Sequence, residues 1–235
     1  MDFARYKYLT CNQNKLIMKK KLWIPLTLLL ISGIVFASCD ALSTNSDEEP
    51  SGLQILMKID GNSDSANLNN EITIQEVKFF VEELELDGTK GTRDIEIEDF
   101  IVTLPVNGTP TLIFDKEIMS GVYDEFELEI EKPDDDYPIN DFDFRDETGS
   151  YSLIVKGTFN GDDFTFRTDE DIEIEKDLKP PFKVEEERNG VFTINIDVAS
   201  WFINRNGETL NPNDYRNTET IIKNIKKSFN LVYES

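Results

Sequence analysis

Apolar and polar residues alternate along most of the chain after residue 52, and this period of two predicts β-strands. The clearest case is 122–132, where Phe126, Leu128 and Ile130 alternate with glutamates. Such a strand has one buried face and one face in water, as strands of antiparallel sheets commonly do. Runs with the same alternation are 53–59, 95–104, 111–114, 151–159, 164–166, 172–174, 182–184 and 192–198.

Residues 71–87 fit both a strand and a helix. Their β-branched and aromatic residues favour a strand, with β-bulges where the alternation changes phase. Asn160-Gly161 lies between two alternating runs and predicts a tight hairpin turn, since both residues tolerate positive φ. About 9–10 short strands separated by such turns predict a mostly β domain. We expect an antiparallel β-sandwich, or an open barrel, over 53–235.

The C-terminal segment has a different pattern. Within 218–229, Ile221, Ile222, Ile225 and Phe229 fall on one face of a helix. This stripe predicts a C-terminal amphipathic α-helix packed on the sandwich. Its lysines leave a helix lying on a membrane surface as the alternative.

The N-terminal part contains an apolar run at 22–35. Its 14 residues are fewer than the roughly 20 that a membrane-spanning helix needs. Met18 and three lysines precede the run, and Ala37-Ser38-Cys39 follows it. A charged start, a short apolar middle and small residues before a cleavage point are typical of an export signal.

This stretch resembles the lipobox signal of bacterial lipoproteins. The resemblance implies cleavage before Cys39 and attachment of a lipid to its thiol, and therefore an anchor in a bilayer. It divides the chain into an N-terminal 1–17 from a start assigned too early, a signal peptide at 18–38, and a flexible acidic tether at 39–52. An exported protein with a free thiol at Cys39 is the alternative.

The mature chain is expected to be a cell-envelope protein, on the periplasmic side of the outer membrane or on the cell surface. Which membrane and leaflet it occupies depends on the bacterial lineage. Its layout of lipobox, acidic tether, strand-rich domain and a late Asp-Val-x-x-Trp-Phe motif resembles that of uncharacterised exported β-sandwich lipoproteins. That resemblance implies no activity.

The charge of the chain is strongly negative, at −23. Met1 to Cys39 holds six basic residues and one acidic residue, so the 196 residues after it hold 18 and 46, a formal charge of −28. A field of this sign repels nucleic acid. The chain has no His, which excludes Ser-His-Asp catalysis and His-based metal sites. Carboxylate chemistry remains.

Two acidic segments are candidate calcium sites, because calcium prefers several oxygen ligands. In the first, Asp60, Asn62, Asp64 and Glu71 have the spacing of side-chain ligands in an EF-hand loop. However, Ser65 occupies the position where that loop needs Gly, and the flanking residues predict strands. A polar loop between strands is the alternative.

The second candidate segment follows the glutamate-rich strand. The alternative to a calcium site here is a solvated acidic loop. The candidate ligands all have short side chains with oxygen donors. They are Asp134, Asp136, Asn140, Asp141 and Asp143, with Asp135 and Asp146 nearby.

The sequence therefore predicts a lipid-anchored, non-enzymatic binding module for a protein or carbohydrate ligand. A carboxylate-dependent hydrolase of the glycosidase kind, which needs two carboxylates at a defined separation, and a purely structural envelope component are the alternatives. Trp201 and Phe202 are expected to be core residues, with a sugar-stacking platform as the alternative.

Overall fold

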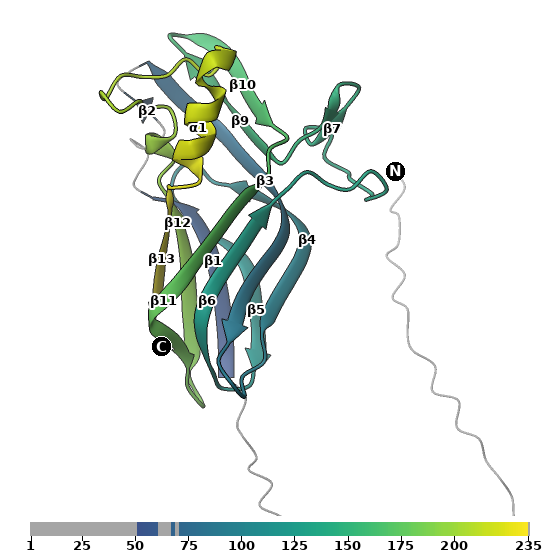
Figure 1. The fold of residues 1–235 in the computed structure, drawn as a ribbon, viewed down its shortest axis with the longest axis vertical. Coiled ribbons are helices and arrows are strands. Elements are labelled where there is room, and N and C mark those ends of the chain that lie inside the picture. Colours follow the sequence, from purple (N-terminus) through teal and green to yellow (C-terminus); the bar gives the residue numbers. More distant parts are fainter. Residues whose placement is uncertain (1–50, 61–66, 69–70, 235) are drawn as a thin grey trace, which may run out of the picture. The chain divides into compact units, whose positions relative to one another are not determined.

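The computed structural model describes residues 51–60, 67–68 and 71–234, and most of them form strands (Figure 1). The prediction of a mostly β fold is confirmed. Ten of the described strands have six residues or more, and the other three have two. The strands are β1 (Ser51–Ile59), β2 (Asn67–Leu68), β3 (Ile72–Gly88), β4 (Ile95–Leu104), β5 (Thr111–Ile118), β6 (Gly121–Ile130), β7 (Arg145–Asp146), β8 (Gly149–Ser150), β9 (Leu153–Phe159), β10 (Asp162–Thr168), β11 (Ile172–Val184), β12 (Asn189–Ile196) and β13 (Phe229–Glu234).

The strands form two facing sheets and one short hairpin. The first sheet has the order β13-β12-β1-β5, and the second contains β10-β9-β3-β6-β11, with β2 and β4 also paired to β3. The pairs are antiparallel, as expected, with one exception: β1 and β12 run parallel. A parallel pair needs a long crossover connection, and the alternation of apolar residues alone does not reveal it.

The long strand β3 joins two regions of the second sheet. It pairs with β9 along Ile72–Phe79 and with β6 along Val81–Gly88. Its register shifts between Ile74 and Glu76 and again between Val81 and Glu83. Each shift lets the apolar residues continue to point into the core although their alternation changes phase. The prediction of a bulged strand in this segment is confirmed.

The core lies between the two sheets and continues beneath the helical segments. Trp201 and Phe202 are fully buried, so they are core residues and the sugar-stacking alternative is excluded. The indole of Trp201 donates a hydrogen bond to Oγ of Ser228 at 2.7 Å, which satisfies its only polar group. The ring of Phe202 packs edge-on against those of Phe164 and Phe166.

The C-terminal helix α1 (Thr218–Ile225) is shorter than expected. Ile221 and Ile225 are buried, which confirms its packing on the sandwich. Phe229, however, is not part of the helix: it begins β13, where it lies opposite Ile196 of β12. Two short 3-10 segments, η2 (Val198–Ser200) and η3 (Tyr215–Asn217), precede α1.

The turn between β9 and β10 is the predicted two-residue hairpin. Asn160 and Gly161 have φ angles of 53° and 89°, the left-handed conformations that this turn requires. Elsewhere, the runs expected separately at 172–174 and 182–184 belong to the single strand β11, which is irregular between Asp177 and Phe182.

Candidate functional site: an acidic sheet face

The outward face of β4, β3, β6 and β11 carries carboxylates in cross-strand register. The inward residues of these strands are buried or partly buried, which leaves the alternate positions to face water. Acidic residues occupy eleven of those outward positions, and we call this surface the acidic face. Its members are Glu83, Glu85 and Asp87 of β3, Glu96 and Glu98 of β4, Glu125, Glu127 and Glu129 of β6, and Glu173, Glu175 and Asp177 of β11.

The acidic face is arranged in three rows that run across the strands. The register aligns Glu98, Glu83, Glu129 and Glu173 in one row, Glu96, Glu85, Glu127 and Glu175 in the next, and Asp87, Glu125 and Asp177 in the third. Strands lie about 4.8 Å apart and same-face residues about 6.8 Å apart along a strand. The face is therefore a regular array of negative charge.

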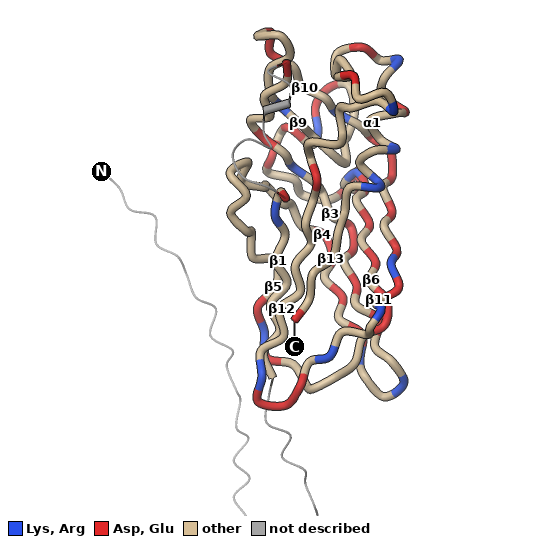
Figure 2. Tube along the Cα trace, turned by 90° about the vertical axis from the view of Figure 1, so that its left-hand side faces the viewer, with Lys and Arg blue, Asp and Glu red and all other residues tan. Residues whose placement is uncertain are grey.

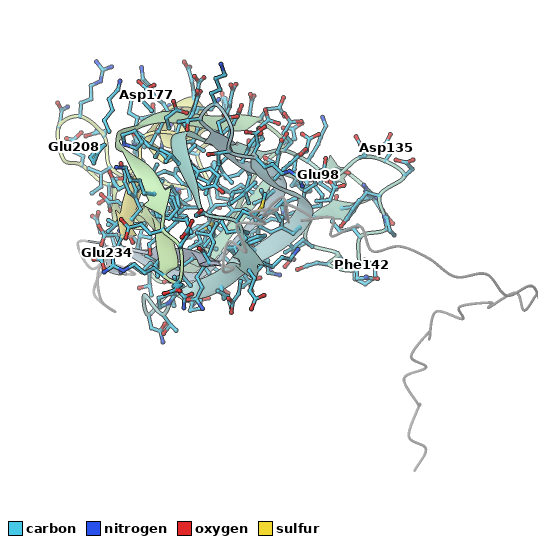
Figure 3. The ribbon with its side chains drawn as sticks, turned by 90° about the horizontal axis from the view of Figure 1, so that it is seen from below. Glu98, Asp135, Phe142, Asp177, Glu208 and Glu234 are labelled. Carbon is cyan, nitrogen blue, oxygen red and sulfur yellow. The ribbon has the colours of Figure 1, made fainter. Side chains whose placement is uncertain are left out.

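The charges of this array are not balanced by cations. Among the eleven, Asp177 alone has an ion-pair partner within the described residues, the exposed Lys179 at 2.5 Å. Figure 2 shows the acidic residues recurring along β6 and β11. In Figure 3, Glu98 and Asp177 mark the two edge strands of the face. Like charges directly opposite each other destabilise a sheet, so the arrangement is costly for the isolated fold.

Partial burial, and after it the neighbouring charges, raise the pKa values of several carboxylates on the acidic face. Partial burial, with the charges of Asp87 and Glu83, raises the pKa of Glu85 to about 7. Burial also raises the pKa values of Glu83 and Glu129, where neighbouring glutamates add to the effect. Each of these groups therefore holds a proton more tightly than an isolated glutamate does.

Two clusters of carboxylates in this region are compact enough to share a cation. Oxygen atoms of Glu82, Glu129 and Glu131 lie within 4.8 Å of one another, and so do those of Glu85, Asp87 and Asp94. Burial and a hydrogen bond with Glu82 raise the pKa of Glu131 to about 7. Such oxygen-only sets suit a hard cation such as calcium.

Neither cluster contains a residue of the two predicted calcium loops. In the loop between β6 and β7, Asp141 and Asp143 come together around the ammonium of Lys78, at 2.8 and 2.7 Å. Lys156 also binds Asp143, at 2.5 Å, and contacts Glu76 at 3.0 Å. The ammonium groups of Lys78 and Lys156 thus bind two of the carboxylates that were predicted to be calcium ligands, Asp141 and Asp143.

These ion pairs tie the loop to the sheet. Burial alone would lower the pKa of Lys78, but hydrogen bonds to Asp141 and Asp143 outweigh it and raise that pKa. Burial alone would raise the pKa of Asp143, but hydrogen bonds from Lys156 and Lys78 outweigh it and lower that pKa. A small apolar cluster joins Phe144 of the same loop to Phe80 of β3 and Ile154 of β9.

The remaining predicted ligands of this loop do not converge with Asp141 and Asp143. Asp134, Asp136 and Asn140 are exposed. The guanidinium of Arg145 donates to the backbone carbonyl oxygens of Asp134 and Asp135, rather than to their side chains. Asp135 and Phe142 extend outward from the sheets (Figure 3).

Of the first predicted calcium loop, the structure describes Asp60, the two-residue strand β2 and Glu71. Asp60 is exposed directly after β1, and Glu71 is exposed directly before β3. Asn62 and Asp64 lie outside the described residues.

The predicted signal at 18–38 and Cys39 also lie outside the described residues, as does the tether except for Ser51 and Gly52, which belong to β1. Within the part of the chain that the structure describes, no helix is long and apolar enough to cross a membrane.

No family model matches the chain, and no curated protein or solved structure matches it either. The functional interpretation therefore depends on the physical properties of the described surfaces.

The sequence revealed part of the acidic face but not its extent. The alternation at 122–132 already indicated a row of outward glutamates along one strand. The signal for the rest was the similar alternation of Glu83, Glu85 and Asp87, and of Glu173 and Glu175. Their alignment into rows depends on strand pairings between distant segments, which the alternation does not specify.

Proposed function

We propose that the protein is a non-enzymatic binding module, anchored to a cell-envelope membrane through a lipid on Cys39, whose acidic face binds a positively charged segment of a partner protein. The observation that supports this most is the array of eleven aligned carboxylates with almost no balancing cations. The isolated fold carries the cost of their repulsion, and a cationic partner would relieve it.

The spacing of the array suits an extended basic segment. Side chains on one face of an extended chain recur about every 6.8 Å, the separation of the carboxylate rows along each strand. A segment that alternates Lys or Arg with small polar residues would therefore place successive cations over successive rows. Such contacts between opposite charges steer association and fix register.

The predicted alternatives have less support from the geometry. Glu85, whose pKa is strongly raised, lies on the outward face of β3 and not in a cleft. Glu131, the other such group, directly follows β6 and lines a hollow whose other walls include the exposed Asp134, Asp135 and Asp136. An acid pair for hydrolysis works best where bulk water is displaced. A purely structural component would not need the acidic face, since neutral polar residues would form the same strands without the destabilising repulsion between like charges.

Binding can be tested with a labelled eight-residue peptide that alternates Lys and Thr. Its affinity for the full chain in detergent is measured by fluorescence anisotropy, beside a Glu/Thr peptide. We expect the Lys/Thr peptide to bind and the Glu/Thr peptide not to bind. The double variant Glu85→Gln/Glu127→Gln should weaken binding of the Lys/Thr peptide about tenfold. The matched double variant Glu117→Gln/Glu186→Gln removes the same charge elsewhere and should change affinity by less than about twofold.

Equal losses in the two double variants would mean that net charge, and not the acidic face, attracts the peptide, and would refute the proposal. Anchoring is tested separately by Cys39→Ala. This variant should leave the membrane fraction, and a variant that stays membrane-bound would contradict lipidation.

A further inference from the structure

A hollow beside α1 differs in charge from the rest of this acidic chain. It has a volume of about 520 Å³ and lies between α1 and the loop at 204–206. Three cations line it, Arg205, Lys223 and Lys227, against one carboxylate, Glu219. The hollow thus has a local excess of positive charge.

The cations of this hollow are available to a ligand. Within the described residues, the side chains of Arg205, Lys223 and Lys227 form no ion pair or hydrogen bond. The side chains of Asn206 and Thr220, which also line the hollow, have no hydrogen-bond partner there either. The site therefore offers unpaired charged donors next to neutral groups that can both donate and accept.

The walls of the hollow are held in place from behind. Asn224 donates hydrogen bonds from its amide to the carbonyl oxygens of Trp201 and Ile203, at 3.0 and 2.8 Å. These bonds join α1 to the segment that leads into the 204–206 loop. Within that loop, the side-chain oxygen of Asn204 accepts from the backbone N–H groups of Asn206 and Glu208. A preformed site of this kind loses little conformational entropy when it binds a ligand.

We propose that this hollow binds an anionic saccharide, a sugar ring that carries a carboxylate or a phosphate group. Its volume falls in the range of small-molecule sites. Arg and Lys recognise carboxylate and phosphate oxygens, while Asn206 and Thr220 suit sugar hydroxyls. All the residues that line the hollow are polar or charged, which disfavours an apolar ligand.

The arrangement along α1 also predicts the sign of each contribution. Glu219 and Lys223 are four residues apart in α1, so they lie about one turn apart on the same side of the helix. Lys227 lies in the turn after α1 and lines the same hollow. The lysines attract an anion and Glu219 repels it. Figure 1 shows α1 at the end of the sandwich opposite the start of β1.

The proposal can be tested by isothermal titration calorimetry of the full chain in detergent, with glucuronate, glucose 6-phosphate and neutral glucose as separate ligands. Comparing the first two shows whether the hollow prefers a sugar with a carboxylate or a sugar with a phosphate. We expect at least one anion to bind at least tenfold more tightly than glucose. Lys223→Gln and Lys227→Gln should each weaken binding of that anion about 5–10-fold, and Glu219→Gln should tighten it about twofold or more.

Lys226→Gln is the matched control, because Lys226 is exposed on the same segment but does not line the hollow. It should change affinity by less than about twofold, and circular dichroism should show the fold of all variants intact. No binding at 10 mM, equal binding of glucose, or an equal effect of Lys226→Gln would overturn the proposal. The acidic-face variants should leave this binding unchanged, so the two proposals can fail separately.

Discussion

Replacing Glu85 by Gln removes a charge from the centre of the acidic face, and we expect it to stabilise the fold. Glu85 lies directly opposite Glu96 on β4 and Glu127 on β6. Opposed like charges each cost roughly 0.2–1 kcal/mol, so relieving both pairs predicts a gain of about 0.4–2 kcal/mol. The raised pKa of Glu85 gives an upper bound, since a rise from 4.5 to about 7 corresponds to about 3 kcal/mol.

The gain from Glu85→Gln should depend on pH with a definite sign. Glu85 holds its proton more tightly in the folded chain than in the unfolded chain, so the wild type loses stability as pH rises from 4.5 to about 7. The Gln variant has no such loss. Its advantage should be near zero below pH 4.5 and complete above pH 7.

Urea unfolding at pH 4.5 and pH 8 measures both effects. We expect about 0.4–2 kcal/mol of extra stability at pH 8, which in a thermal melt corresponds to a rise in Tm of about 1–8 °C. Glu117→Gln is the control, because Glu117 is exposed on β5 opposite Gly52 and should change stability by less than about 0.5 kcal/mol. A destabilised Glu85→Gln variant, or a gain that does not vary with pH, would refute the repulsion argument.

Three further predictions concern the rest of the described fold. Lys78→Met should lower the free energy of unfolding in urea by about 2–3 kcal/mol, because it leaves Asp141 and Asp143 without the cation that they share. The control Lys179→Met, which removes an exposed ion pair, should lower it by less than about 0.5 kcal/mol, and similar losses in the two variants would contradict this reasoning. Gly157→Ala should lower the free energy of unfolding by about 1–3 kcal/mol or more, because the added Cβ would lie 2.1 Å from the carbonyl oxygen of Thr73. An unchanged Tm would show that β3 and β9 do not approach so closely at Gly157. Millimolar calcium should raise the Tm of the wild type relative to chelator, because the cluster of Glu82, Glu129 and Glu131 can share a cation, and it should not raise the Tm of Glu129→Gln. Identical midpoints of the wild type with calcium and with chelator would refute calcium binding by this cluster.

Local patterns in the sequence were sufficient for much of the sandwich. The phase changes within 71–87 correctly indicated bulges, because a strand can restore its buried face after a slip only by adding a residue. Asn160-Gly161 likewise indicated a hairpin, since few other pairs adopt two positive φ angles without strain. Both features depend on residues close together in the chain.

Features that depend on distant segments could not be predicted in this way. Phe229 fits the stripe of a helix and also the start of a strand, and its pairing with Ile196 decides for the strand. Lys78 and Lys156 carry no sequence signal that links them to Asp143, because the three residues meet only after β3 and β9 pair and the loop folds over them. The rows of the acidic face have the same origin.

The proposed role of the acidic face can be tested most directly by mapping where a basic peptide touches the chain. A zero-length carbodiimide reagent joins carboxylates to lysine amines only where they are in contact, and mass spectrometry then identifies the joined residues of the full chain. We expect the Lys/Thr peptide to be joined mainly to the acidic face, at Glu85, Glu127 and Glu175. Products spread evenly over other exposed acids such as Asp135, Glu186 and Glu208 would contradict the proposed site.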